Sequence, residues 1–230
     1  MICTLKDRRM AKIAEAVREG VTVFDIGSDH ALIPVYLLKS GKCPRAVIID
    51  ISRNSLEKGL KNVIKEGVSG QVEAICTDGT LGLDLPDEAD IIIAGMGGEL
   101  IAEIISRDER LKDKRYRLIL QPMTKVRELR IYLSESGFSD IKEQRVLSCG
   151  KIYCVISCGY TGSKEKTGDK EAYFGYGFDR THNEDRQYAK KTLNDLKRKM
   201  EGLKSSGKTD SEELNKTGKL ISYLEKELDS

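Results

Sequence analysis

Short apolar runs rich in β-branched residues recur along the first half of the chain, and they constrain its fold more than any other feature. They are VTVFDI, AVIID, QVEAICT, ADIIIAG and RLILQP. The spacers HALIPVYLLKSG and SRNSLEKGLKNVIKEG carry apolar residues at helical spacing and finish near glycine. Buried strands alternating with helices are typical of a parallel sheet covered by helices. The sequence therefore predicts an open α/β sheet.

The pattern changes after RLILQP. KVRELRIYLSESGF reads as a helix, and DIKEQRVLSCGKIYCVISCGY reads as two strands around Cys149-Gly150-Lys151. Strands joined so closely must be antiparallel. We therefore predict a Rossmann-like, mostly parallel seven-stranded sheet with an antiparallel terminal hairpin, as in class I methyltransferases. A dinucleotide-binding dehydrogenase half would normally end with another parallel strand.

The last third of the chain has a different organisation. Residues 161–170 are polar and predict a connector, so we place a methyltransferase domain at residues 1–160 and a C-terminal extension at 161–230. Two apolar seams predict a helical coiled-coil hairpin, reversed at KSSGKTDS. The seams are Leu193, Leu196, Met200 and Leu203, then Leu214, Ile221, Leu224 and Leu228.

Composition excludes several classes of protein. No apolar stretch approaches the roughly 18 residues that span a bilayer, and the N-terminus lacks the features of a secretory signal, so we expect a cytoplasmic protein without a membrane partner. Six cysteines form no CxxC pair, which favours reduced thiols and no metal site; a site on the last three cysteines would fit no common zinc spacing. The net charge of +2 neither demands nor excludes a polyanionic partner.

Polar residues and glycines cluster where the predicted parallel strands end. In an open parallel sheet, ligands bind outside the carboxyl ends of the strands. The residues found there are Asp25, Gly27, Ser28, Asp29 and His30, then Asp50 and Ile51, then Asp78 and Gly79, then Ala94, Gly95, Met96, Gly97 and Gly98, then Gln121 and Pro122.

This row suits a nucleoside that carries positive charge. Gly27 would allow a close backbone approach, Asp50 could accept both ribose hydroxyls, and Asp78 could accept an adenine amine. A phosphate-binding G-x-G-x-x-G turn is absent, and Asp25 and Asp29 would repel phosphates. S-adenosylmethionine has no phosphate and carries a sulfonium and an ammonium, so its charge is complementary to these acids.

Simpler explanations exist for each residue taken alone. Asp29 could cap a helix, Asp78 could be an ordinary turn residue, and His30 could be packed or capping. The AGMGG stretch could reflect tight packing between strand and helix rather than a closely approaching substrate. The acids are more specific together, because they follow successive strands.

DIGSDHA, IAGMGGELI and LILQP, in order and spacing over roughly residues 1–160, resemble the TrmK family of bacterial tRNA methyltransferases, which act on N1 of adenine 22. LKDRRMAKIA resembles the basic opening helix of that family, with Arg9 at its usual arginine. The resemblance implies cofactor contacts at Asp25, Gly27, Asp29 and His30, with Met96 beside the methyl group. The sequence departs from the family at IIDIS, where Gly-Glu is usual, and at Met123, where asparagine is favoured.

The predicted reaction is transfer of a methyl group from S-adenosylmethionine to N1 of adenine 22 in tRNA. Adenine N1 has an in-plane lone pair and needs no base, but its methylated product is cationic, so we predict Asp29 as the catalytic carboxylate. An N6 enzyme would be expected to carry a Pro-Pro-aromatic stretch after the fourth strand, which AGMGG lacks.

We predict a monomer that binds tRNA. Alternatives are a non-catalytic RNA-binding protein on this scaffold, a methyltransferase for another substrate, and a nicotinamide-dependent oxidoreductase. The first helix of the C-terminal hairpin could clamp a phosphate backbone, or its charged side could equally be a solvated face. Its basic residues are Arg186, Lys190, Lys191, Lys197, Arg198, Lys199 and Lys204. The predicted substrate-binding residues are Arg8, Arg9, Gly97, Gln121, Pro122, Lys190, Lys197 and Arg198.

Overall fold

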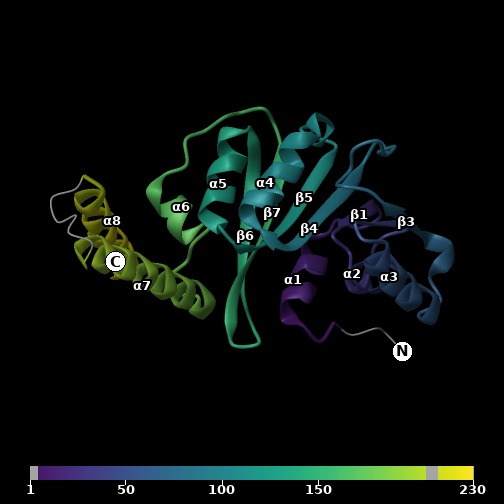
Figure 1. The fold of residues 1–230 in the computed structure, drawn as a ribbon, viewed down its shortest axis with the longest axis horizontal. Coiled ribbons are helices and arrows are strands. Elements are labelled where there is room, and N and C mark those ends of the chain that lie inside the picture. The colour runs from purple at the N-terminus through teal and green to yellow at the C-terminus, as the bar shows by residue number, and fades with distance from the viewer. Residues whose placement is uncertain (1–4, 206–211, 230) are drawn as a thin grey trace. The chain divides into compact units, whose positions relative to one another are not determined.

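The computed structural model describes residues 5–205 and 212–229. The chain divides into two compact units, residues 1–166 and 167–230. The first unit contains a seven-stranded sheet and five α-helices (Figure 1). Its elements are α1 (Arg8–Ala16), β1 (Thr22–Ile26), α2 (Leu32–Lys39), β2 (Ala46–Asp50), α3 (Arg53–Lys65), β3 (Val72–Cys76), β4 (Ala89–Gly97), α4 (Gly98–Arg107), β5 (Tyr116–Thr124), α5 (Val126–Glu135), β6 (Phe138–Ser148) and β7 (Lys151–Tyr160), with short 3-10 turns at Ser69–Gln71 and Glu109–Leu111.

The strand order is β3-β2-β1-β4-β5-β7-β6. Strands β1 to β5 pair in parallel, whereas β7 is antiparallel to both β5 and β6. The two-residue turn of the hairpin has positive φ at Cys149 (49°) and Gly150 (73°), as tight hairpins require. The predicted α/β class and the antiparallel terminal hairpin are confirmed.

Helices cover both faces of the sheet. On one face, α1, α2 and α3 contribute Ile13, Leu37 and Val63 to a core that includes the strand residue Ile48. On the other face, α4 and α5 pack through Ile101 and Leu129 against strand residues such as Ile91 and Leu118. Burial on both sides explains why the parallel strands are continuous apolar runs.

One expected crossover helix is missing. Residues 77–88 join β3 to β4 without a helix, so the strand-helix alternation breaks there. This segment, TDGTLGLDLPDE, contains two glycines and a proline and has no apolar spacing typical of a helix.

The second unit consists of α6 (Asp169–Phe174), α7 (Asn183–Ser205) and α8 (Glu212–Asp229). Helices α7 and α8 share a core with α6, and the ion pairs Lys197–Glu225 (2.6 Å) and Lys199–Glu213 (2.9 Å) join them side by side. The buried residues of this core are Phe174, Ala189, Leu193, Leu196, Ile221 and Leu224. The predicted reversal at KSSGKTDS lies mostly outside the described residues, and the coiled-coil geometry stays a prediction.

Two features that bear on function were also sought in the described part of the chain. None of its helices has the length and apolarity that crossing a membrane demands. Nor do its histidines, cysteines and acids gather anywhere into a group able to hold a metal ion.

Candidate functional site

A cavity of about 230 Å³ lies at the carboxyl ends of β1, β4 and β5. Nine of the predicted site residues line it, and so do five residues that the sequence did not indicate. The predicted ones are Arg9, Asp25, Gly27, Ser28, Asp29, His30, Ala94, Gly95 and Gln121; the others are Met10, Ile13, Ala31, Leu32 and Ile33. The cavity therefore lies where the open-sheet rule locates a ligand.

Asp25 is a buried acid in the cavity wall, at the end of β1. Burial raises the pKa of its carboxyl group to about 6; the Ser28 hydroxyl opposes this rise, and the negative charge of Asp50 adds to it. Since Asp25 is ionised at neutral pH with little solvation, a bound cation would stabilise it.

The Met96 side chain packs against Gly27, just after the end of β1. The φ of Gly27 is +81°, and a Cβ atom added there would lie 2.2 Å from Met96 Cε. The left-handed backbone favours glycine at this position, and the absence of a side chain leaves the space that the end of the flexible Met96 side chain fills. This contact joins the ends of β1 and β4.

Asp29 and His30 follow Gly27 at the exposed rim of the cavity. The Asp29 carboxylate accepts a hydrogen bond from Lys58 Nζ (3.2 Å) and lies 3.1 Å from His30 Nε2. The hydrogen bond from Lys58 is the main cause that lowers the Asp29 pKa; desolvation opposes it, and the His30 charge adds a smaller lowering. The capping alternative for Asp29 is wrong, because α2 begins after Ala31 and has no side-chain cap.

Asp50 and Asp78 extend the acidic row along β2 and β3 beyond the residues that line the cavity. Asp50 Oδ1 accepts a hydrogen bond from the Ser52 backbone N–H at 2.7 Å. Asp78 is exposed and pairs with Arg107 at 2.6 Å. Ile51, between these two strand ends, is 74% exposed, so an apolar surface lies there without cover in the protein.

Glycine is present for different structural reasons at the three glycine positions of AGMGG. Gly95 has φ +79° with open space around it, at an irregularity where β4 pairs with β5. At Gly97, by contrast, an added Cβ would approach the Thr124 hydroxyl to 3.3 Å, and at Gly98 it would lie 2.3 Å from the Lys125 carbonyl oxygen. Tight packing against the β5–α5 turn therefore explains Gly98, while Gly95 remains open to a ligand.

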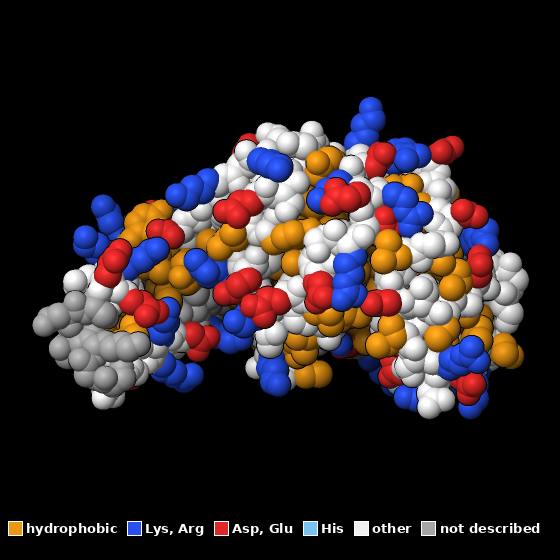
Figure 2. All heavy atoms as spheres, turned by 45° about the horizontal axis from the view of Figure 1, so that its top comes forward, with side chains coloured by type: hydrophobic (Ala, Val, Ile, Leu, Met, Phe, Trp, Pro, Cys, Tyr) orange, Lys and Arg blue, Asp and Glu red, His pale blue; other side chains and the backbone are white. Residues whose placement is uncertain are grey.

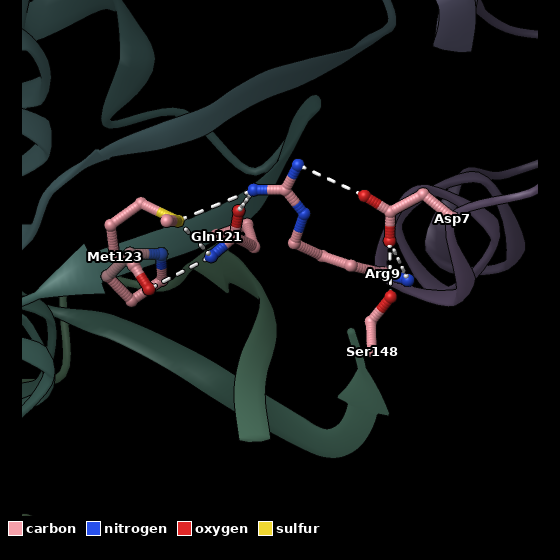
Figure 3. Close-up of polar contacts among 6 residues, drawn as sticks. Asp7, Arg9, Gln121, Met123 and Ser148 are labelled. Carbon is pink, nitrogen blue, oxygen red and sulfur yellow. Dashed lines mark hydrogen bonds and ion pairs between the residues drawn. The ribbon is translucent and has the colours of Figure 1, made fainter. Parts of the chain in front are cut away.

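Arg9 connects α1 to the end of β5 (Figure 3). Its Nη1 donates to Gln121 Oε1 at 3.1 Å and to Met123 Sδ at 3.4 Å, and its Nη2 donates to Asp7 at 3.2 Å. The guanidinium also lies over the ring of Tyr153, 5.3 Å from its centroid. Arg9 is thereby held at a fixed place in the cavity wall.

Asp7 anchors this network at the start of α1. It caps the helix by accepting from the Arg9 backbone N–H at 2.8 Å, and it accepts from Ser148 Oγ at 2.7 Å. Partial burial raises the Asp7 pKa, but the hydrogen bonds from Ser148 and Arg9, together with the Arg9 charge, lower it overall. The N-cap was readable as Asp7 preceding a helical pattern, whereas the contact with Ser148 joins residues 141 apart in sequence.

Of the two neighbouring residues Gln121 and Pro122, only Gln121 lines the cavity. Gln121 is fully buried, and its Nε2 donates to the Pro122 carbonyl oxygen at 2.9 Å. Because the Arg9 donor faces Oε1 and an acceptor faces Nε2, the orientation of this amide is determined. Pro122 does not line the cavity.

The predicted RNA-binding residues of α7 belong to the second unit. Lys190, Lys197 and Arg198 are all exposed, but Lys197 pairs with Glu225 and Arg198 lies 3.5 Å from Asp195. Acids thus offset part of the positive charge of this helix face. Basic and acidic side chains are likewise interspersed over the face of the molecule in Figure 2.

Comparisons with known proteins show the family and the fold of this chain. The model of the methyltransferase domain family matches residues 6–156. A tRNA (adenine(22)-N(1))-methyltransferase of Bacillus subtilis (strain 168) is 32% identical over 168 residues, which cover 73% of this chain and 67% of that protein.

Solved structures share the fold over nearly the whole chain. Streptococcus pneumoniae Sp1610, assigned as a tRNA (m1A22) methyltransferase and solved with S-adenosyl-L-methionine, is 25% identical with a TM-score of 0.82 and covers 97% of this chain and 100% of its own. B. subtilis TrmK is 23% identical with a TM-score of 0.78, covering 99% of this chain and 97% of its own, and supports the fold alone.

Proposed function

Because this chain belongs to the TrmK family of tRNA methyltransferases, we propose that it transfers a methyl group from S-adenosylmethionine to N1 of adenine 22 in tRNA. The observation that carries the proposal is the acidic cavity at the ends of β1, β4 and β5, with Asp25 buried in its wall. A buried acid with a raised pKa suits a cationic cofactor and would repel the phosphates of a dinucleotide.

The residues along the strand ends fit the parts of this cofactor. Asp50 at β2 and Asp78 at β3 are proposed to accept hydrogen bonds from its ribose and its adenine amine, with Ile51 as the apolar surface for the adenine ring. Asp25, Gly27, Ser28 and His30 would hold the sulfonium-bearing end, beside Ala94 and Gly95. Gly79, after β3, completes the proposed set.

S-adenosylmethionine supplies an electrophilic methyl group on a sulfonium when it is bound. The task of the protein is to align the adenine N1 lone pair with that carbon, so that the N1–C bond forms as the C–S bond breaks and its electrons return to sulfur. Met96, packed against Gly27, would border the path of the methyl group. Because N1 lies on the Watson–Crick edge, the base must be unpaired or extruded to reach the site.

Asp29 is proposed as the carboxylate that faces the developing positive charge on adenine. Its ionisation is secured by Lys58 and His30, so it is negative throughout the neutral range. We expect Asp29→Ala to lower the turnover number at least about tenfold while cofactor still binds. Single-turnover methyl transfer with saturating cofactor tests this role, and near-normal turnover of the variant would reject it.

Recognition of tRNA is proposed to involve both units of the chain. In the first unit, Arg8, Gly97, Gln121 and Pro122 would face the substrate; in the second, Lys190, Lys197 and Arg198 would contact the phosphate backbone. We propose that the protein acts as a monomer in the cytoplasm, where tRNA is found.

The proposal is tested by incubating the protein with S-adenosylmethionine carrying a labelled methyl group and an unmodified tRNA transcript. Label in the tRNA is the expected result, with none when position 22 is guanine. Tight tRNA binding with no label at saturating cofactor would instead favour a non-catalytic RNA-binding protein.

A further inference from the structure

Arg9 is the only lysine or arginine among the described residues that line the cavity. Its side chain is 19% exposed, and three bonds to Gln121, Met123 and Asp7 occupy three of the five N–H groups of a guanidinium. Of the remaining two groups, Nε–H is buried and has no hydrogen-bond partner in the described structure, and one N–H of Nη2 is not used by these three bonds. Arg9 therefore keeps capacity for a further acceptor.

The charges in the cavity are separated along the strand order. The negative groups Asp25 and Asp29 lie at and just beyond the carboxyl end of β1, whereas the positive Arg9 reaches the end of β5, with β4 between them. Such a dipolar wall complements a zwitterion, in which an ammonium and a carboxylate lie a few bonds apart. The amino-acid end of S-adenosylmethionine is a zwitterion of this kind.

The order of the strands also orients the cofactor. If its nucleoside end lies over Asp50 and Asp78 at β2 and β3, its amino-acid end must extend toward β1, β4 and β5, where Arg9 lies. We infer that Arg9 binds the carboxylate of the amino-acid end of S-adenosylmethionine, rather than the tRNA backbone. This inference rests on the proposed use of that cofactor.

The surrounding contacts prepare Arg9 for this role. Asp7 binds Nη2 while its own charge is shared with the α1 N-terminus and with Ser148 (Figure 3). Tyr153 covers one face of the guanidinium. Gln121 is buried and fixed by its bond to Pro122, so its Oε1 is a stationary acceptor. Asp7, Gln121 and Tyr153 are thus positioning residues, and their contacts reduce the entropy that Arg9 loses on binding.

The test compares two ligands in the absence of tRNA, by calorimetry on the full chain. S-adenosylmethionine has the carboxylate, and its decarboxylated analogue lacks it but keeps the sulfonium and the amine. The wild-type protein should bind S-adenosylmethionine roughly 10- to 100-fold more tightly than the analogue. Arg9→Met should remove most of that preference by weakening S-adenosylmethionine alone, and Arg9→Lys should retain part of it.

Lys12→Met is the matched control, because it removes the same charge from α1 at a residue outside the cavity. It should leave both affinities unchanged. Equal weakening of both ligands by Arg9→Met, or no weakening, would overturn the inference; a raised KM for tRNA with unchanged cofactor affinity would assign Arg9 to the RNA.

Equal affinities of the wild-type protein for the two ligands would also overturn the inference, even if no Arg9 variant folds. Failure to bind either ligand would count against the proposed cofactor itself, and a failure of tRNA methylation would not affect this comparison.

Discussion

At the scale of single residues, the ionisation of Asp25 links stability to cofactor binding. Its pKa is raised by burial to about 6, compared with 3.8 for an ordinary aspartate. A carboxyl group with a raised pKa favours the folded state at low pH, and this contribution is lost as the pH rises from about 4 through about 6. At neutral pH the ionised Asp25 therefore costs stability, by about 3 kcal/mol at most.

Asp25→Asn should consequently raise the melting temperature at pH 7.5 and have little effect at pH 4, because the amide carries no charge to bury. The same change should weaken binding of the cationic cofactor. In the wild-type protein, cofactor affinity should fall as the pH is lowered through about 6, and this fall should be absent in the variant. Thermal denaturation between pH 4 and 8 and calorimetry between pH 5 and 8 check both effects, and a variant less stable at pH 7.5 would contradict this explanation.

The sequence predicted individual residues well where a strand end defines their location. Asp25, Gly27 and Gly95 lie at or just beyond the carboxyl ends of recognisable strands, so their presence at one edge of the sheet could be expected. The contacts of Arg9 could not, because they bring together residues 112 positions apart and depend on how α1 packs over β5. Likewise, the sequence does not indicate which glycine of the pair Gly97-Gly98 packs against the backbone of another segment; in the structure it is Gly98, beside the Lys125 carbonyl.

At the scale of elements, α7 is proposed as the RNA-binding helix, yet Glu225 of α8 already pairs with Lys197. Arg198 is paired less closely, at 3.5 Å from Asp195 compared with 2.6 Å between Lys197 and Glu225, so Lys190 and Arg198 should carry more of the phosphate contact. Replacing both by Gln should weaken tRNA binding and reduce the slope of log affinity against log salt by roughly two, while cofactor affinity stays unchanged. Filter binding of tRNA over a range of salt concentrations measures this slope.

Lys216→Gln with Lys219→Gln is the corresponding control, since both residues are exposed on α8 and the loss of charge is the same. An equal effect of the control pair would show that net charge, rather than α7, determines binding. An unchanged slope in the α7 variant would contradict the proposed contact.

The spacing of apolar residues predicted whether a segment is a helix or a strand wherever the pattern extended over enough residues to distinguish the two. Five apolar runs became parallel strands, and the close connection at Cys149-Gly150 fixed the antiparallel hairpin. The absence of a helix between β3 and β4 is a local departure that a general alternation cannot predict. The short helix α6 begins at Asp169, within the stretch expected to be a connector, because its core contacts come from α7 and α8.

At the scale of the whole molecule, the chain joins a sheet that carries the proposed cofactor site to a helical unit, residues 167–230, that is proposed to contact tRNA through α7. The order of the strands, and hence the direction in which the cofactor lies, depends on long-range packing that sequence spacing does not specify. The fold and the family are supported by relatives over most of the chain. The proposed mechanism depends most on the claim that N1 of adenine 22 is the methylated atom.

The most direct measurement is mass spectrometry of nucleosides from unmodified bacterial tRNA after incubation with this protein and S-adenosylmethionine, with a transcript substituted at position 22 as the control. We expect N1-methyladenosine to appear and to be absent from the control. N6-methyladenosine, methylation of the control, or no methylated nucleoside despite bound cofactor would contradict it.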